Sequence, residues 1–366
     1  MPEESKIRCA TRADVAKRAG VSVTVVSYVL NNNRYVEKEK RARVLQAARE
    51  LHYTPNNIAR ALKGKSSHHI IFIVDNTTNE RFGRLVGEMD RFAYEKGSMV
   101  SLCANRNNPE FIRQVIARRF DGVIISSISF PDAYIREFVD AGIPVVLLQS
   151  REYPQLEGVA KIGTGLYHGA QECVRYFYNQ GRRHILYIDR ISKRNHFSDM
   201  SDNRYRGFIR GMEACGLESE GRMITGCTTE EEVQRRLADY MQSHPVDAIL
   251  GRNDRMACVA MKQVLHSGRR VPEDVGIIGY DDSSVCKLVT PSLTSMKMQE
   301  EKIAQAAVEM LYEMQTGSEV PETRKFSAQM VVRRSTDPSA AEEEFQGGLL
   351  WGNSTLWWCM AARPRQ

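Results

Sequence analysis

The sequence lacks the features that mark metal-binding, disulfide-stabilised and membrane-spanning proteins. Its 366 residues include eight cysteines, and no two of them form a C-x-x-C pair. Zinc-knuckle spacing and the cysteine density of a disulfide scaffold are therefore absent, and we expect reduced thiols, no metal site and no cofactor. No apolar run approaches the roughly 20 residues that a membrane-spanning helix needs. The first six residues, Met-Pro-Glu-Glu-Ser-Lys, also lack the apolar segment of a secretory signal. We therefore expect a cytoplasmic protein with no membrane partner.

Tryptophan is scarce, and all three tryptophans lie beyond residue 350. They belong to a tail, 337–366, in which the apolar residues show no heptad spacing. We expect this tail to be disordered or weakly docked. A regulatory or oligomer contact and a readthrough or frame change in the gene are open alternatives.

Positive charge is concentrated at the N-terminus. Residues 1–65 contain 14 Lys and Arg against 6 Asp and Glu, whereas the whole chain has 51 against 45. The remaining 301 residues are therefore slightly acidic, with 37 basic against 39 acidic residues. A small basic module joined to a large, nearly neutral body predicts that one part binds a polyanion and the other senses a different ligand.

The basic module has the pattern of a helix-turn-helix. Thr11 and Asp14 are spaced as a capping box that begins a short helix, Asp14 to Ala19, which Gly20 ends. Ser22 caps a second helix over 23–31, and a third, amphipathic helix is expected over about 38–51. The small core should contain Val26, Val29 and Leu30 from the second helix and Val44, Leu45, Ala48 and Leu51 from the third. The alternative is a plain three-helix bundle with a solvated polar face.

A second segment, 53–65, makes nucleic-acid binding more specific. It contains Pro55 at a helix start, one short helical turn, and Gly64 as a stop. So short a helix is unstable alone in water, so we expect it to form only against DNA and a dimer mate. Leu62, set among basic residues, would be its apolar contact.

Three motifs in this region resemble the lactose-repressor/galactose-repressor family of bacterial transcription regulators. They are T-x-x-D-V-A-x-x-A-G-V-S from Thr11, V-V-S-Y-V-L-N from Val25, and Y-x-P-N-x-x-A-R-A-L from Tyr53. The resemblance implies that Val23 and Thr24 set operator preference and that Leu62 wedges between base steps in the minor groove. It also implies binding to a palindromic operator as a homodimer. Tyr28 departs from the pattern, because the family commonly has Arg there, which could contact guanine with two hydrogen bonds.

We predict a set of DNA-contacting residues from the polar face of the second helix and from these motifs. They are Thr11, Ser22, Val23, Thr24, Ser27, Tyr28, Asn31, Tyr53, Asn56, Ala59 and Leu62. Arg12, Arg34 and Lys38 should contact phosphates.

The body of the chain reads as an α/β protein. Six apolar runs, rich in β-branched residues and separated by helical stretches, predict buried parallel strands near 70–74, 122–125, 144–148, 184–188, 247–250 and 275–279. They fall into two blocks, about 70–160 and 166–290, which predict two doubly wound lobes with the segment after Pro291 crossing back between them. Polar residues follow most of these runs, where open parallel sheets bind ligands. Some of them could instead serve only as helix caps.

The family resemblance extends through the body and implies a bilobed, periplasmic-binding-protein-like fold. R-x-x-G-F occurs at Arg204, N-D-x-M-A at Asn253 and G-Y-D-D at Gly279. The resemblance implies that Arg204, Asn253 and Asp281 bind a small-molecule effector. With the strand-end residues, the predicted effector site is Asp75, Ser126, Gln149, Arg204, Asn253 and Asp281. Gly165 departs from the family, which often has Asp there.

The predicted organisation is a helix-turn-helix domain (1–54), a hinge helix and linker (55–67), an effector-binding and dimerisation domain (68–336) and the tail. The expected function is a ligand-responsive repressor, with a sugar or sugar derivative as effector and a purine-type co-repressor as the alternative. An enzyme is disfavoured, because Gly163-Thr164-Gly165 followed by Gly169 has the wrong spacing for a dinucleotide site. The basic head disfavours an exported solute-binding protein. The cleft residues disfavour a DNA-bending protein without an effector.

Overall fold

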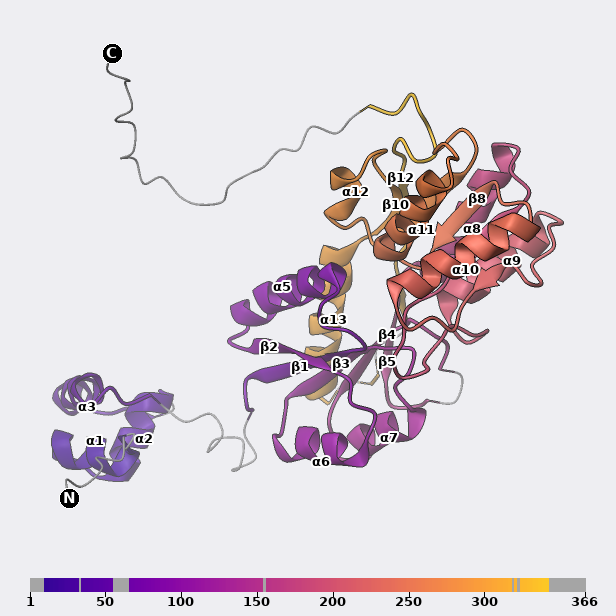
Figure 1. The fold of residues 1–366 in the computed structure, drawn as a ribbon. Helices are drawn as coiled ribbons and strands as arrows, with labels where there is room; N and C mark the ends of the chain where they lie inside the picture. The colour runs from indigo at the N-terminus through magenta and orange to yellow at the C-terminus, as the bar shows by residue number, and fades with distance from the viewer. Residues whose placement is uncertain are drawn as a thin grey trace, which may run out of the picture.

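The computed structural model describes residues 10–32, 34–54, 66–153, 156–317, 319–320 and 323–341. It consists of a three-helix N-terminal domain and a two-lobed α/β body (Figure 1). The predicted hinge contacts Asn56, Ala59 and Leu62, and the tail from residue 342 onward, lie outside the described residues. In the part of the chain described, no helix is both long and apolar enough to cross a bilayer.

The N-terminal domain contains α1 (Arg12–Ala19), α2 (Val23–Asn31) and α3 (Lys38–Glu50). Its helix ends follow the expected chemistry. Asp14 accepts from the backbone N–H of Thr11 at 2.8 Å, and Thr11 Oγ1 accepts from the backbone N–H of Asp14 at 3.3 Å, which closes the capping box. Gly20 ends α1 at φ 66°, and the Ser22 hydroxyl caps α2. The predicted helix-turn-helix is therefore confirmed, with α1 beginning two residues earlier than expected.

The core of this small domain differs from the prediction at one position. Val26, Val29, Val44 and Ala48 are buried as expected. Leu45 is instead 39% exposed, because in α3 it lies on the outward face while Val44, Ala47 and Ala48 face α1 and α2. The other two residues predicted for this core, Leu30 and Leu51, are only partly buried and lie at its edge.

The first lobe is a six-stranded sheet in the order β11-β5-β4-β3-β1-β2. Its strands are β1 (His69–Val74), β2 (Met99–Ala104), β3 (Gly122–Ser126), β4 (Val145–Leu148), β5 (Ala160–Gly163) and β11 (Arg324–Lys325), all paired in parallel. One face packs on α6 (Pro109–Ala117) and α7 (Asp132–Asp140), and the other on α5 (Glu80–Glu95) and α13 (Glu300–Gln315). Both faces are covered, which is why the strands read as continuous apolar runs.

The second lobe repeats this plan with the order β12-β10-β9-β8-β6-β7. Its strands are β6 (Ile185–Ile188), β7 (Met223–Ile224), β8 (Ala248–Gly251), β9 (Gly276–Tyr280), β10 (Thr294–Met298) and β12 (Ala328–Val331). Only β12 is antiparallel, against β10. The helices α8 (Leu166–Asn179) and α9 (Asn203–Ala214) cover one face, α10 (Glu230–Ser243) and α11 (Asp254–His266) cover the other, and α12 (Val285–Leu288) follows β9.

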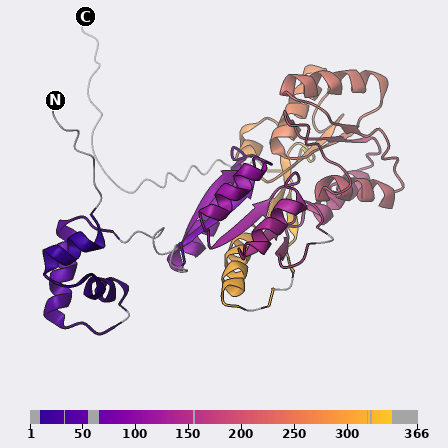
Figure 2. The same cartoon turned by 90° about the horizontal axis from the view of Figure 1, so that it is seen from below.

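The chain crosses between the lobes more than once. It passes into the second lobe after β5, returns after β10 to form α13 and β11 in the first lobe, and crosses again to β12. In Figure 1 and Figure 2 α13 lies against the first lobe although its sequence neighbour β10 belongs to the second. The predicted crossover after Pro291 is confirmed.

Candidate DNA-binding and effector-binding sites

The outer face of α2 presents the side chains predicted to read DNA. Val23 is 45% exposed and Thr24 is also exposed, whereas Val26 and Val29 on the opposite face are buried. Ser27, Tyr28 and Asn31 are half-buried along the same outer face. Exposed side chains near the N-terminus of a second helix are placed to reach base edges in the major groove.

Two arginines hold the tyrosines of this domain. The Arg34 guanidinium donates to the Tyr28 hydroxyl at 3.4 Å and lies 5.2 Å from the centre of its ring. Arg12 donates to the Tyr53 hydroxyl at 3.3 Å and to Ser27 Oγ at 3.5 Å. A guanidinium therefore stands beside Tyr28, so this face keeps a cation although the family's usual arginine is replaced by tyrosine.

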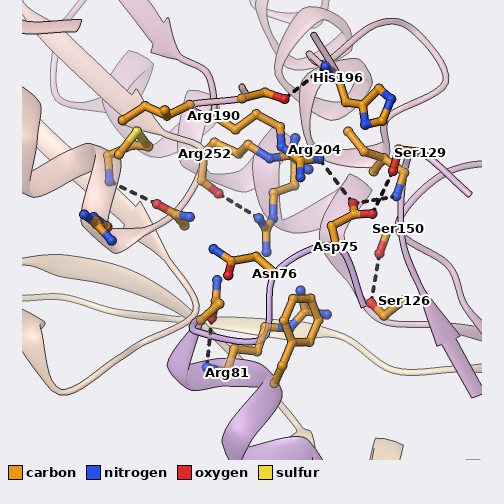
Figure 3. A pocket seen from close by; sticks show the side chains of 18 of the residues that line it. Asp75, Asn76, Arg81, Ser126, Ser129, Ser150, Arg190, His196, Arg204 and Arg252 are labelled. Atoms are coloured by element: carbon orange, nitrogen blue, oxygen red, sulfur yellow. Dashed lines mark hydrogen bonds and ion pairs between the residues drawn. The ribbon is translucent and has the colours of Figure 1, made fainter. Parts of the chain in front are cut away.

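A cavity of about 440 Å³ lies between the two lobes of the body. This is within the usual size of a small-molecule site, roughly 300–1,000 Å³. The polar residues that line it from the first lobe are Asp75, Asn76, Asn79, Arg81, Asn105, Ser126, Ser129 and Ser150. Those from the second lobe are Arg190, Ser192, Lys193, Arg194, His196, Arg204, Arg252, Asn253 and Arg255 (Figure 3).

Strand ends explain most of this lining. Asp75 follows β1, Ser126 ends β3, Arg190 lies two residues after β6 and Asn253 lies two residues after β8. Because parallel strands end at one edge of a sheet, and the two sheets face each other at that edge, residues distant in sequence meet around one cavity.

Asp75 is the only carboxylate among the lining residues of this cavity. It accepts from Ser129 Oγ at 2.9 Å, the backbone N–H of Ile128 at 3.1 Å and the Ser127 hydroxyl, and it pairs with Arg190 at 3.2 Å. Burial by itself would raise the pKa of Asp75, but the Arg190 charge and these hydrogen bonds outweigh it and lower the pKa. Asp75 is therefore ionised at neutral pH.

Arg204, in the first turn of α9, is held from two sides. One of its terminal nitrogens donates to the backbone carbonyl of Arg252 at 2.8 Å, and the other donates to Asp281 at 2.6 Å. Its guanidinium also lies 4.5 Å from the Tyr280 ring centre. The neighbouring Arg252 is bound in turn by Asp202, which caps α9. The guanidinium groups of Arg204 and Arg252 are thus both held by hydrogen bonds and ion pairs.

The structure brings together most of the predicted effector residues but not all of them. Asp75, Ser126, Arg204 and Asn253 line the cavity, and Asn253 also caps α11 through Met256. Asp281 does not line it and is instead paired with Arg204. Gln149 does not line it either, whereas the next residue, Ser150, does.

Sequence reasoning found Arg204 but did not place the other arginines of the cavity in the effector site. Arg190 and Arg252 follow strands, so the strand-end rule could have found them. Arg81 carries no such signal, because it is the second residue of a helix whose approach to the second lobe depends on tertiary packing.

Gly165, the departure from the family motif, is explained by its surroundings. It precedes α8 with φ 82°, and a Cβ there would lie 2.5 Å from the backbone nitrogen of Ala328. An L-residue such as Asp would be strained in this conformation and would clash with the chain entering β12.

The fold and the paired sites define the class of protein: a helix-turn-helix transcription regulator with a bilobed effector-binding domain. Residues 11–56 match the family described as "Bacterial regulatory proteins, lacI family", and 174–336 match the "Periplasmic binding protein-like domain". The HTH-type transcriptional repressor PurR of Serratia proteamaculans (strain 568) is 30% identical over 311 residues, covering 82% of this chain and 89% of that protein. The chain therefore belongs to the lacI family of bacterial regulatory proteins.

The fold is also that of solved structures of other proteins. A lac repressor dimer bound to operator and the anti-inducer ONPF has a TM-score of 0.76 at 24% identity, covering 90% of this chain and 99% of that one. A periplasmic binding protein/LacI transcriptional regulator from Alkaliphilus metalliredigens QYMF, complexed with D-xylulofuranose, has a TM-score of 0.61 at 25% identity. It covers 74% of this chain and 99% of that one.

Proposed function

We propose that this regulator is a repressor that binds a palindromic operator as a homodimer. A carbohydrate effector that binds in the interlobe cavity would raise or lower its affinity for the operator. The observation that carries the proposal is that one chain holds both an exposed α2 reading face and a polar cavity between two lobes. The D-xylulofuranose bound to the Alkaliphilus neighbour supports a carbohydrate.

Binding would act by changing the angle between the lobes. The cavity residues come from both sheets, so an effector that contacts both favours one relative orientation over another. The two helix-turn-helix domains of a dimer would then be brought to, or removed from, the spacing of the two half-sites. The coupling is reciprocal: an effector that weakens operator binding is itself bound more weakly on DNA by the same factor.

Exposed apolar side chains support the dimer. Tyr94 is 76% exposed on α5, Met99 is 65% exposed on the edge strand β2, and Leu288 is 66% exposed on α12. Hydrogen bonds from Ser284 to Glu80 place the start of α12 beside the start of α5, so these elements belong to one flank of the two lobes (Figure 1). Such residues are typical of a surface that is covered in an assembly.

The test is fluorescence anisotropy of labelled palindromes found upstream of the gene, at fixed salt. We expect specific binding that a member of a panel of sugars, sugar phosphates, sugar acids and purines strengthens or weakens. A purine that promotes binding would favour the co-repressor alternative. Specific binding that no panel member alters would count against the effector proposal, and binding no tighter than to scrambled DNA would count against the repressor itself.

Sedimentation of the Met99→Glu variant and of the wild-type protein tests the dimer. Equal masses for the two proteins would exclude this flank as the dimer interface.

A further inference from the structure

The interlobe cavity carries more positive charge than its own carboxylates balance. Seven cationic side chains line it: Arg81, Arg190, Lys193, Arg194, Arg204, Arg252 and Arg255. Four of them have carboxylate partners, namely Asp75 for Arg190, Asp281 for Arg204, Asp202 for Arg252 and Glu230 for Arg255. Among the described residues no carboxylate lies within ion-pair distance of the other three.

Arg81 is the most unusual of these three. The residue is only 4% exposed, yet its Nε and Nη2 have no hydrogen-bond partner in the described structure. The carboxylates whose charges act on it are Asp281 and Glu300. Asp281 is already paired with Arg204 at 2.6 Å, and Glu300 is bound by two nitrogens of Arg84 at 2.8 and 2.9 Å.

An arginine in this position stays charged. Burial lowers the pKa of Arg81 to about 10, which still leaves the guanidinium protonated at neutral pH. A buried, unpaired charge is unfavourable unless a partner arrives, and buried donors are ordinarily satisfied. The fold holds this charge in place, because Arg81 lies in the first turn of α5 and that helix is packed against the core through Leu85 and Met89.

The surroundings of Arg81 are arranged for an anion. Arg204, whose charge also acts on Arg81, has its own Nε without a partner. The helices α5, α9 and α11 all begin at this cavity, since Asn79, Arg204 and Asn253 line it. Helix N-termini present N–H groups and a partial positive charge, which favours bound oxyanions.

We propose that the effector carries an oxyanion, a phosphate or a carboxylate, that binds at Arg81 and Arg204 between the starts of α5 and α9. This proposal rests on the proposed effector role of the cavity and narrows its ligand to an anionic one, such as a phosphorylated sugar or a sugar acid. Figure 3 shows Asn76 between Arg204 and Arg81, with Ser126, Ser129 and Ser150 on the side of the cavity where Asp75 lies. The anion would lie beside Asn76, between the two arginines, and the serine hydroxyls and Asp75 would bind sugar hydroxyls.

The first experiment uses inorganic phosphate as the probe and the melting temperature of the full chain as readout. Phosphate is compared with chloride at equal ionic strength for the wild-type protein, Arg81→Gln, Arg81→Lys and Arg113→Gln. Arg113 is the matched control, because it is an exposed arginine on α6. We expect phosphate to raise the melting temperature of the wild-type protein and of Arg113→Gln, and to have a much smaller effect on Arg81→Gln. Arg81→Lys should recover part of the response.

A structural role for Arg81 predicts a different result. If Arg81 serves only packing, Arg81→Gln should lower the melting temperature in chloride. If its role is to bind an anion, Arg81→Gln removes an uncompensated charge, so the melting temperature in chloride should stay unchanged or rise. Equal phosphate responses in all four proteins would overturn the proposal.

A second experiment separates this proposal from the proposed function. Pairs of a neutral compound and a related anion are titrated into the protein by calorimetry, and then into the operator-binding assay. The pairs are glucose and glucose 6-phosphate, fructose and fructose 6-phosphate, glucose and gluconate, and hypoxanthine and inosine monophosphate. We expect only the anionic member of a pair to bind, with the dissociation constant raised about ten- to a hundredfold in Arg81→Gln. Tight binding of a neutral member, unaffected by Arg81→Gln, would overturn the anion proposal and leave the regulator intact. An anion that binds through Arg81 without changing operator affinity would uphold the subsite and count against effector control.

Discussion

The carboxylate of Asp75 in the first lobe lies 3.2 Å from the guanidinium of Arg190 in the second, so an ion pair joins the two lobes across the cavity. Arg194 adds a second link, donating to the backbone carbonyl of Asn105 at 2.9 Å. Both contacts must break if the lobes separate. They are therefore part of the closed arrangement on which effector control would act.

Asp75→Asn should loosen this closure. The change leaves Arg190 without its carboxylate partner, so we expect small-angle scattering of the ligand-free protein to show a larger radius of gyration. In the wild-type protein the pKa of Asp75 is lowered, so its contribution is present above the ordinary carboxyl pKa and is lost as pH falls through the lowered value. Lowering the pH should therefore increase the radius of gyration of the wild-type protein and have little further effect on that of Asp75→Asn. The exposed Asp140→Asn is the control, and equal scattering from all three proteins would contradict the role of the pair.

Arg204→Gln should abolish the effector response and keep operator binding. Arg204 is 5% exposed and pairs with Asp281, so removing its charge also leaves a buried carboxylate uncompensated. We expect a loss of about 3–5 kcal/mol in the free energy of unfolding, measured by chemical denaturation. Adding Asp281→Asn should recover much of that stability without restoring the response. If Arg204→Gln alone still responds to effector at wild-type strength, Arg204 is excluded from the effector site.

Gly165→Ala and Gly87→Ala should have opposite effects on stability. Gly165 has φ 82° and lies against the backbone of Ala328, so a Cβ there should cost roughly 1–3 kcal/mol. Gly87 lies inside α5 with open space around it, so alanine should stabilise the protein by about 0.5–1 kcal/mol. Thermal unfolding of the two variants measures both. A neutral Gly165→Ala would show that the chain entering β12 adjusts easily.

Thr24→Ala should weaken operator binding more than binding to scrambled DNA. Thr24 is exposed on the outer face of α2, where a lost base contact is worth about 1–3 kcal/mol. Arg34→Ala should instead weaken both kinds of binding and reduce the slope of log affinity against log salt by about 1. Gln46→Ala, exposed on α3, is the control. Equal losses on operator and scrambled DNA for Thr24→Ala would show that this residue does not read sequence.

Asp254→Asn should change the pH dependence of stability. Burial and the nearby Asp281 charge raise the pKa of Asp254 to about 7. The folded protein then holds a proton that the unfolded chain releases near pH 4, so this group makes folding less favourable as pH rises from about 4 to about 7. Between pH 5 and pH 8 the wild-type protein should lose roughly 1–4 kcal/mol relative to the variant, measured by denaturation at each pH. A difference in the free energy of unfolding between the two proteins that stays constant from pH 5 to pH 8 would contradict this prediction.

Local chemistry carried most of the predictions that the structure confirms. The capping box at Thr11, the left-handed Gly20 and the six buried runs depend on neighbouring residues alone, so sequence reasoning found them. The strands it did not place are short or lie toward sheet edges, such as β7 with two residues and β11 with two. Such strands are set by the partner they pair with, so their own sequence carries little signal. The wrongly placed Leu45 has the same cause, since which side of α3 faces the core depends on α1 and α2.

For the effector site, sequence identified the groups that strand ends present, such as Asp75 and Ser126, and the family motifs identified Arg204 and Asn253. The bounds of the domains and the roles of the site residues stay predictions. By itself the sequence determined the basic head, the element types and the two-lobed plan, because charge, capping and hydrophobic runs are local properties. Only the tertiary structure decided that Arg190 meets Asp75 and that Arg81 is buried without a partner. Those facts depend on how two separately formed sheets face each other, a relationship that no stretch of neighbouring residues encodes.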